Sequence, residues 1–162
     1  MKKITIALLS LLIIGCANES QSPIIGQWQT KTCEVAPDSL GSHAGEFGKG
    51  IYEFTTSGII NIYVQFYTGP ACTEEIELVF FEPTNGVFMF TDLGKTTLQE
   101  GIEGNILELS FPTGDPEEIF YIITNNEACF SNSLEFNVYN SSYQQSGTSA
   151  INFERCLVKQ QP

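Results

Sequence analysis

The stretch Ile59-Ile60-Asn61-Ile62-Tyr63-Val64-Gln65-Phe66-Tyr67 decides the fold of this chain. Every second side chain from Ile60 to Phe66 is apolar, whereas the positions between them carry Asn61, Tyr63 and Gln65. A period of two puts the apolar side chains on one face of a β-strand and the others on the opposite face. The stretch therefore predicts a strand that buries one face.

Turn signals on both sides of this stretch extend the pattern along the chain. Thr56-Ser57-Gly58 precedes it and suits a hairpin, and Pro83-Thr84-Asn85-Gly86 separates the next pair of apolar runs. No segment carries the apolar stripe of an amphipathic helix. The segments expected to be strands are 24–33, 50–55, 59–67, 74–82, 87–93, 102–111, 118–124, 134–139 and 151–158.

Short strands at this regular spacing predict an all-β fold, an antiparallel up-and-down β-barrel of about eight to nine strands. A β-sandwich is the alternative that the same spacing allows. Residues 36–50 and 140–149 are expected to be loops, because they are rich in small and polar residues. Ile76, Leu78 and Phe80 repeat the alternation opposite Glu75 and Glu77. The side chains expected to line a barrel are Tyr52, Phe54, Ile62, Val64, Leu78, Phe80, Phe88, Phe90, Leu107 and Leu109.

The first residues read as an export signal rather than as part of the fold. Lys2 and Lys3 precede an apolar run from Ile4 to Ile14. That run is shorter than the roughly 20 residues that a membrane-spanning helix needs. A basic start followed by a short apolar run and a small residue is typical of a secretory signal peptide.

The end of this run, Leu12-Ile13-Ile14-Gly15-Cys16, resembles the lipobox of bacterial lipoproteins. The resemblance implies that the Cys16 thiol carries diacylglycerol, that residues 1–15 are removed, and that acyl chains hold the protein at a membrane. Ala17 stands where an aspartate would imply retention at the inner membrane, so the resemblance favours an outer-membrane lipoprotein. The alternative is an ordinary secretory signal that leaves Cys16 as a plain thiol.

Composition and charge limit what the remaining chain can bind. Residues 16–23 are a polar tether after the lipidated cysteine, and residues 24–162 have the length of one domain. The formal net charge is −12, and Lys2 and Lys3 belong to the signal peptide, so the exported protein is more acidic still. This charge disfavours nucleic acid as a partner. It suits either a cationic partner or simple solubility.

Five cysteines become an even set of four once Cys16 is assigned to lipid. Export makes disulfides chemically reasonable, and four cysteines allow three connectivities. The pairs Cys33 with Cys72 and Cys129 with Cys156 are preferred, because each closes a moderate loop within one half of the chain. No Cys-x-x-Cys occurs and His43 is the only histidine, so neither a metal site nor a cofactor is expected.

The residues Ile25-Gly26-Gln27-Trp28 open the first expected strand. They resemble the Gly-x-Trp motif of the lipocalin and wider calycin families, and Thr91-Asp92-Leu93 resembles the middle motif in degenerate form. The resemblance implies an eight-stranded barrel that Trp28 closes at one end. It also implies that an arginine near the last strand packs over the indole, and Arg155 is the only arginine in this chain.

Two hypotheses about function follow. The first is a membrane-anchored binding module that holds a small apolar ligand inside the barrel. The alternative is an acidic interaction or inhibitor module that docks a cationic protein of the envelope or of a host. An enzyme is not expected, because no catalytic residue can be named and His43 is expected to be a solvated loop residue.

Overall fold

The computed structural model describes residues 21–36, 42–83, 86–97, 101–131 and 156–161. Apart from short helical turns near Ser42 and Gly101, these residues form strands and the connections between them. The expected strand 134–139 and the first part of the expected strand 151–158 lie outside the described residues. The strands are β1 (Gly26–Thr30), β2 (Glu34–Val35), β3 (Phe47–Phe54), β4 (Ile59–Tyr67), β5 (Glu75–Phe80), β6 (Phe88–Thr97), β7 (Glu103–Ser110), β8 (Glu117–Thr124), β9 (Glu127–Phe130) and β10 (Leu157–Lys159).

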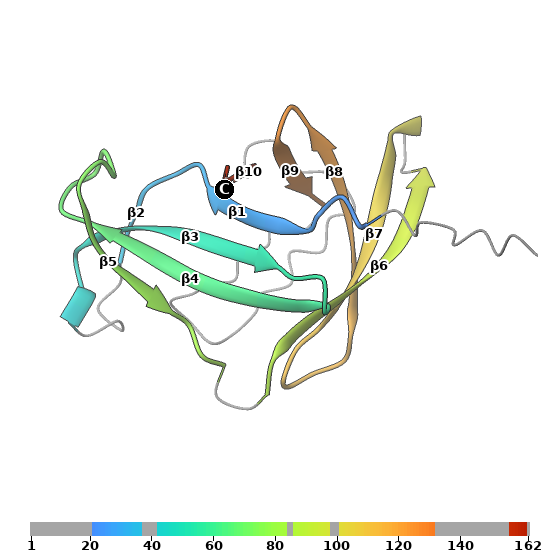
Figure 1. The fold of residues 1–162 in the computed structure, drawn as a ribbon, viewed down its shortest axis with the longest axis horizontal. Coiled ribbons are helices and arrows are strands. Elements are labelled where there is room, and N and C mark those ends of the chain that lie inside the picture. Colours follow the sequence, from blue (N-terminus) through green and yellow to red (C-terminus); the bar gives the residue numbers. More distant parts are fainter. Residues whose placement is uncertain (1–20, 37–41, 84–85, 98–100, 132–155, 162) are drawn as a thin grey trace, which may run out of the picture.

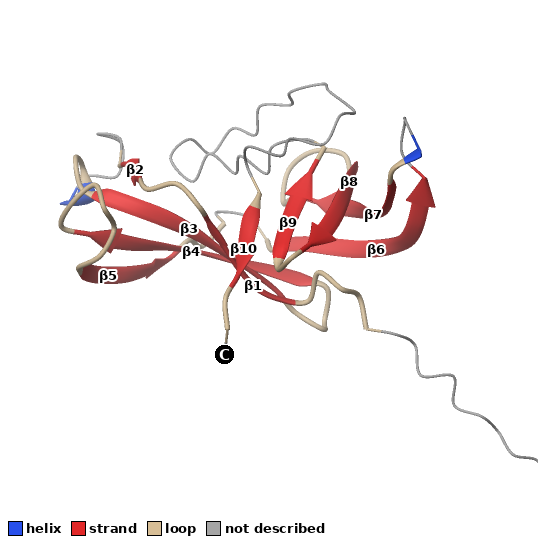
Figure 2. Ribbon diagram, turned by 90° about the horizontal axis from the view of Figure 1, so that it is seen from above, coloured by secondary structure: helices blue, strands red, loops and turns tan. Residues whose placement is uncertain are grey.

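Eight of these strands close into an antiparallel barrel, which confirms the predicted fold class and excludes the sandwich. Around the barrel the order is β1, β3, β4, β6, β7, β8, β9 and β10, and β10 pairs with β1 again. The strands β2 and β5 are additions, β2 beside β3 and β5 beside β4 (Figure 1). Figure 2 shows β3, β4 and β5 on one side and β6, β7 and β8 on the other, with β1 and β10 between them.

Strand β4 forms as its alternation predicts. Ile60, Ile62, Val64 and Phe66 are all buried, and they are the apolar positions of the period of two. Ile60 and Ile62 belong to one apolar cluster to which all eight barrel strands contribute side chains. Because this cluster joins every wall of the barrel, burial of the β4 face stabilises the whole closed sheet.

The turn between β3 and β4 depends on a glycine. Gly58 has a φ of +79°, and a Cβ there would lie 3.0 Å from the main-chain oxygen of Phe90. Both the left-handed conformation and the close approach exclude larger residues. The Thr55 amide donates to the Ile59 carbonyl at 2.9 Å and closes the hairpin that the sequence predicted.

The expected loop over residues 36–50 is wrong at its end, because β3 already begins at Phe47. Gly48 and Gly50 look like loop residues in the sequence, yet they lie within this strand. A Cβ at Gly50 would lie 3.2 Å from the Tyr52 hydroxyl, so the absence of a side chain leaves room for that ring. Glycine here serves close packing rather than chain flexibility.

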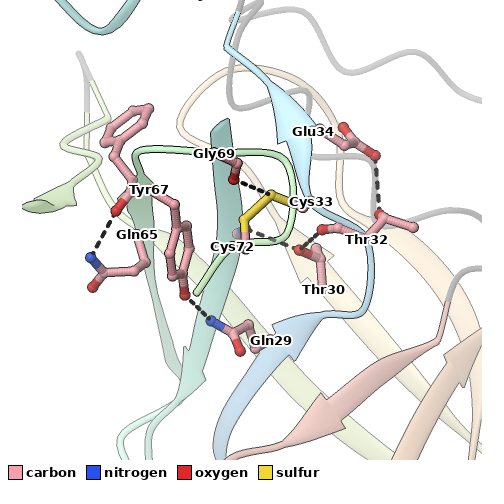
Figure 3. The surroundings of a disulfide bond; sticks show 11 residues. Gln29, Thr30, Thr32, Cys33, Glu34, Gln65, Tyr67, Gly69 and Cys72 are labelled. Carbon is pink, nitrogen blue, oxygen red and sulfur yellow. Dashed lines mark hydrogen bonds between the residues drawn. A yellow bond between two sulfur atoms is a disulfide. The ribbon is translucent and has the colours of Figure 1, made fainter. Parts of the chain in front are cut away.

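Both disulfides join the cysteines that loop length favoured. Cys33 is bonded to Cys72 beside the β4–β5 connection, and Figure 3 shows this bond next to Tyr67. Cys129 of β9 is bonded to Cys156, the residue before β10. Cys129 and Cys156 are both buried and pack with Ile122. The second bond therefore fastens the closing strand β10 to its neighbour β9 in a small buried cluster that is separate from the main one.

Replacing Cys129 and Cys156 together with alanine is expected to lower the free energy of unfolding by about 3–4 kcal/mol. The bond closes a moderate loop in the unfolded chain, with a sequence separation of 27 residues, and alanine avoids burying a new hydroxyl. Unfolding in guanidinium chloride, followed by circular dichroism, measures the loss. An unchanged transition midpoint in the double variant would show that the bond does not hold β10 in the barrel.

Candidate functional site

Trp28 is buried in the main apolar cluster of the barrel. Its side chain has no exposed surface, and its indole Nε1 donates to the Ile24 carbonyl at 2.6 Å. The Lys159 Nζ lies over the ring, 5.2 Å from its centroid. Arg155, which the sequence suggested for this place, lies outside the described residues. In the part of the chain that the structure describes, the cation over Trp28 therefore comes from β10 itself.

A second group of polar side chains fastens the N-terminal segment to the barrel. Asp92 Oδ2 accepts hydrogen bonds from the Ser22 hydroxyl and, at 2.9 Å, from the Tyr121 hydroxyl. Its Oδ1 accepts from the Gly94 amide at 2.9 Å, where the β6–β7 register shifts. Asp92 belongs to the degenerate motif seen in the sequence. Its contacts join the start of the domain to β6 and β8, which is a structural role.

Burial is the main reason why the pKa of Tyr121 is raised above its usual range. The Ser22 hydroxyl opposes this shift, whereas the hydrogen bond and the negative charge of Asp92 add to it. The folded protein thus keeps the phenol proton at a pH at which the unfolded chain has lost it. Stability contributed in this way is complete below about pH 10, the usual tyrosine pKa, and falls as the pH rises beyond it.

We therefore expect the free energy of unfolding to decline above about pH 10, and to decline less steeply in the Tyr121→Phe variant. Denaturant unfolding at a series of alkaline pH values measures both slopes. In the variant the free energy of unfolding still declines in part, because burial and the nearby Glu53 also raise the pKa of Tyr63. Equal slopes for wild type and variant would mean that Tyr121 does not hold its proton in the folded state.

Large side chains fill the interior of the barrel. Of the side chains expected to line it, seven are buried, namely Tyr52, Phe54, Ile62, Val64, Phe90, Leu107 and Leu109. Phe88 is partly buried and packs against the main cluster. Trp28, Tyr121 and Phe130 add further rings to this cluster. Because each barrel strand places apolar groups in it, the interior is a packed core along the described strands.

The expectation that Leu78 and Phe80 line the barrel is wrong. Leu78 is 52% exposed and Phe80 is 45% exposed, and Ile76 on the same strand is 46% exposed. The side chain that packs inward from this strand is Val79, against Val64 and Phe66. The register explains the difference, because Phe80 lies opposite Tyr63, which is on the outward face of β4.

The outward side chains of Tyr63, Leu78 and Phe80 form one apolar surface, called here the β5 surface. The Tyr63 and Phe80 ring centroids are 5.2 Å apart. Glu53 lies at its border, where its Oε2 accepts from the Tyr63 hydroxyl at 3.3 Å and from the Asn61 amide at 2.8 Å. Burial is the largest cause that raises the pKa of Tyr63. The charge of Glu53 and its hydrogen bond with the Tyr63 hydroxyl add to the shift.

The chain around β5 is acidic. Glu74, Glu75, Glu77 and Glu82 are all exposed, and the segment 74–82 contains neither lysine nor arginine. Lys49 lies on β3, opposite Gln65, and is therefore separated from β5 by the whole of β4. An exposed apolar surface with an acidic border is the arrangement that a partner with apolar and cationic groups would complement.

His43 is not the solvated loop residue that the sequence suggested. Its ring stacks on Phe66 with the centroids 4.2 Å apart. Its Nδ1 lies 2.8 Å from Glu46 Oε2, and its Nε2 lies 3.8 Å from Glu77 Oε2. The ring covers the inner apolar side chains between β4 and β5. These contacts pack the residues before β3 against the inward face of β5, opposite the β5 surface.

One group of potential metal ligands occurs among the described residues, namely Glu127, Cys129 and Cys156. Its two sulfur atoms are joined in a disulfide, so they offer no thiolate to a metal ion. Cys16, the expected lipidation site, lies outside the described residues. The β5 surface is the candidate site that sequence reasoning missed. The sequence carried no signal for it, because glutamates that alternate with apolar residues are also typical of a strand with one buried face.

Within the described ranges, none of the helical turns has the length or the apolar character of a membrane-spanning helix. Comparisons with protein-family models, with curated proteins and with solved structures found no match to this chain.

Proposed function

We propose that this protein is a membrane-anchored docking module that binds a cationic protein partner through the β5 surface. The observation that carries the proposal is the outward exposure of Leu78 and Phe80 on a strand bordered by glutamates. Large apolar side chains gathered at one exposed place commonly mark interaction sites. The formal net charge of −12 favours a partner of opposite charge and speeds its approach.

The packed interior makes a small apolar ligand the second choice. A barrel of eight strands is wide enough either to be filled by side chains or to hold one small ligand. Here Trp28, Phe54 and Phe130 are among the buried side chains that occupy the interior. Ligand binding inside the described core would require several of these rings to move, whereas a partner on the β5 surface requires no such change.

The membrane anchor belongs to the same proposal. Lipid on Cys16 would hold the domain at the outer membrane, in an oxidising compartment that suits its two disulfides. Ser22 is bonded to Asp92, so the chain is fastened to the barrel only six residues after Cys16. Six extended residues span at most about 20 Å, which would keep the domain close to the lipid surface.

Replacing both Leu78 and Phe80 with serine is expected to lower the affinity for the partner by at least about tenfold, since each exposed apolar side chain contributes one or more kcal/mol when a partner buries it. The measurement is affinity capture from envelope extract at low salt, with the bound proteins identified and their binding then measured separately. Capture should also weaken as the salt concentration rises.

Leu93→Ser is the matched control, because Leu93 is an equally exposed leucine on β6. This variant should capture the same proteins as the wild type. If the Leu78→Ser/Phe80→Ser variant captures them equally well, the β5 surface is not the docking site.

A further inference from the structure

We infer that the free edge of β5 binds an extended segment of the partner as an added β-strand, with apolar residues alternating with lysine or arginine. This inference rests on the proposed function and names the part of the partner that is recognised. It goes beyond the β5 surface, because it assigns a role to the main chain of β5 as well as to its side chains.

The topology leaves one edge of β5 open among the described strands. In the sheet order β5 is the last strand, and it pairs with β4 alone. β4 pairs with β5 from Tyr63 onward and with β6 only at Ile59 and Ile60. β5 and β6 therefore pair with different parts of β4. Figure 1 shows these two strands running apart.

The main-chain groups at this edge belong to the same residues that expose apolar side chains. The Phe81 amide donates to the Ile62 carbonyl at 2.8 Å, so Phe81 faces β4. Residues of an antiparallel pair alternate between facing the partner strand and facing away from it. The main-chain amide and carbonyl groups of Val79 therefore point toward β4, as those of Phe81 do. The main-chain amide and carbonyl groups of Leu78 and Phe80 point away from β4 and are available to another strand.

Strand β5 has a bulge, because Gln65 pairs with Leu78 and Tyr67 with Glu75, which leaves one extra residue in β5. One main-chain group at the bulge also points toward β4. The Glu77 carbonyl accepts a hydrogen bond from the Gln65 side chain at 3.1 Å, so it is satisfied on the β4 side. The segment Glu75–Phe80 contains no proline, so every residue of β5 keeps its amide donor. Its two glutamates protect the edge against an acidic strand but not against a cationic one. An open edge with an apolar face is the feature that strand addition uses.

The two faces of β5 select the side chains of the added strand. On the outward face, Leu78 and Phe80 would contact apolar side chains of the partner. On the opposite face, Glu77 Oε2 lies 3.8 Å from His43 Nε2, and the Glu77 side chain keeps 60% of its surface exposed, so it would also pair with a lysine or an arginine of the added strand. Side chains of a strand alternate between the faces, so the matching segment alternates apolar and cationic residues.

A second copy of this chain is a poorer occupant of the same edge. A parallel, in-register pairing of two copies would place Glu75 and Glu77 of one chain beside those of the other, and any pairing brings together two chains that each carry a formal charge of −12. Like charges close together on paired strands are destabilising. The same glutamates that disfavour self-pairing favour a cationic strand.

The test uses the whole exported protein in detergent and a labelled peptide, Lys-Val-Lys-Val-Lys-Val-Lys, with blocked ends. The matched control peptide has the same sequence but carries N-methyl groups on alternate residues, which removes the amide donors from one edge. We expect the control to bind at least about tenfold more weakly, because strand addition depends on main-chain hydrogen bonds. Hydrogen exchange at the Leu78 and Phe80 amides should slow at least about tenfold when the first peptide binds.

Two kinds of variant test the edge and the charge. Leu78→Pro removes the amide that faces away from β4 together with the leucine side chain, so it is compared with Leu78→Ala, which keeps the amide. Leu78→Pro should bind the peptide at least about tenfold more weakly than Leu78→Ala, since proline is tolerated at an edge but cannot donate. Glu77→Gln should weaken peptide binding about two- to fivefold, as expected for one cross-strand charge pair. If Leu78→Pro does not fold, the exchange measurement on the wild type decides alone.

Each remaining outcome has a definite meaning. Equal binding of both peptides, or binding without slower exchange at Leu78 and Phe80, overturns strand addition. If strand addition fails but envelope proteins are still captured through the side chains of Leu78 and Phe80, the proposed docking function stands and only the inference about the β5 edge is lost. Failure of both the peptide and the envelope proteins to bind overturns both. Light scattering that shows a dimer paired through β5 overturns the inference in favour of a second copy.

Discussion

Replacing Trp28 with alanine is expected to lower the free energy of unfolding by about 3–5 kcal/mol. The indole has no exposed surface and packs in the cluster that joins all eight barrel strands, so its removal leaves a cavity in the core. The Ile24 carbonyl also loses its donor. Small domains have a total stability of about 5–15 kcal/mol, so this variant would be close to unfolding. Guanidinium chloride unfolding followed by circular dichroism measures the change.

Two milder variants separate the contributions at Trp28. Trp28→Phe keeps a buried ring but removes the Nε1 donor, and Lys159→Ala removes only the exposed cation over the ring. The lysine variant should cost no more than about 1 kcal/mol, because exposed cation–π pairs are weak. A Trp28→Ala protein as stable as the wild type would show that the indole does not stabilise the core.

Replacing Cys16 with serine is expected to move the protein from the membrane fraction to the soluble fraction or to leave its signal peptide uncut. Serine has no thiol to receive diacylglycerol, so the variant would lack the acyl groups that we propose hold the protein at the membrane. Each buried methylene contributes about 0.8 kcal/mol, and two or three acyl chains together make binding effectively permanent. Fractionation and immunoblotting show the location, and mass spectrometry of the first peptide shows the lipid.

Gly15→Ala is the matched control for this experiment, since it keeps a small residue before the cysteine and should leave the protein in the membrane fraction. A wild-type protein that is soluble after export, with an unmodified Cys16 thiol, would instead support the ordinary secretory signal. The same mass analysis should find no free thiol at Cys33, Cys72, Cys129 or Cys156.

Much of the fold could be predicted because strand alternation is a local property. The buried face of β4 and the hairpin at Gly58 follow from residues that are neighbours in the chain. The hairpin between β8 and β9 escaped notice, although Asn125-Asn126 carried a signal. Both residues have a positive φ, 51° and 65°, a conformation that asparagine tolerates better than most residues.

The candidate site could not be predicted in the same way. In the sequence, Ile76, Leu78 and Phe80 have the same alternation as the buried residues of β4. Alternation shows that a strand has two different faces, but it does not show which face will point into the core once the strand pairs with its neighbour. In the structure, pairing of Phe80 with Tyr63 puts these side chains outside, and Val79 takes the inward place.

The sequence by itself determined an all-β chain of alternating strands and an acidic charge, and it favoured the disulfide pairing that closes moderate loops. These properties depend on neighbouring residues or on composition alone. Tertiary structure decided that Lys159 lies over Trp28, that His43 stacks on Phe66 and that β5 exposes its apolar face at an open edge. Each of these depends on which distant segments come into contact when the barrel closes. Packing and strand register decide those contacts, and both exist only in the folded chain.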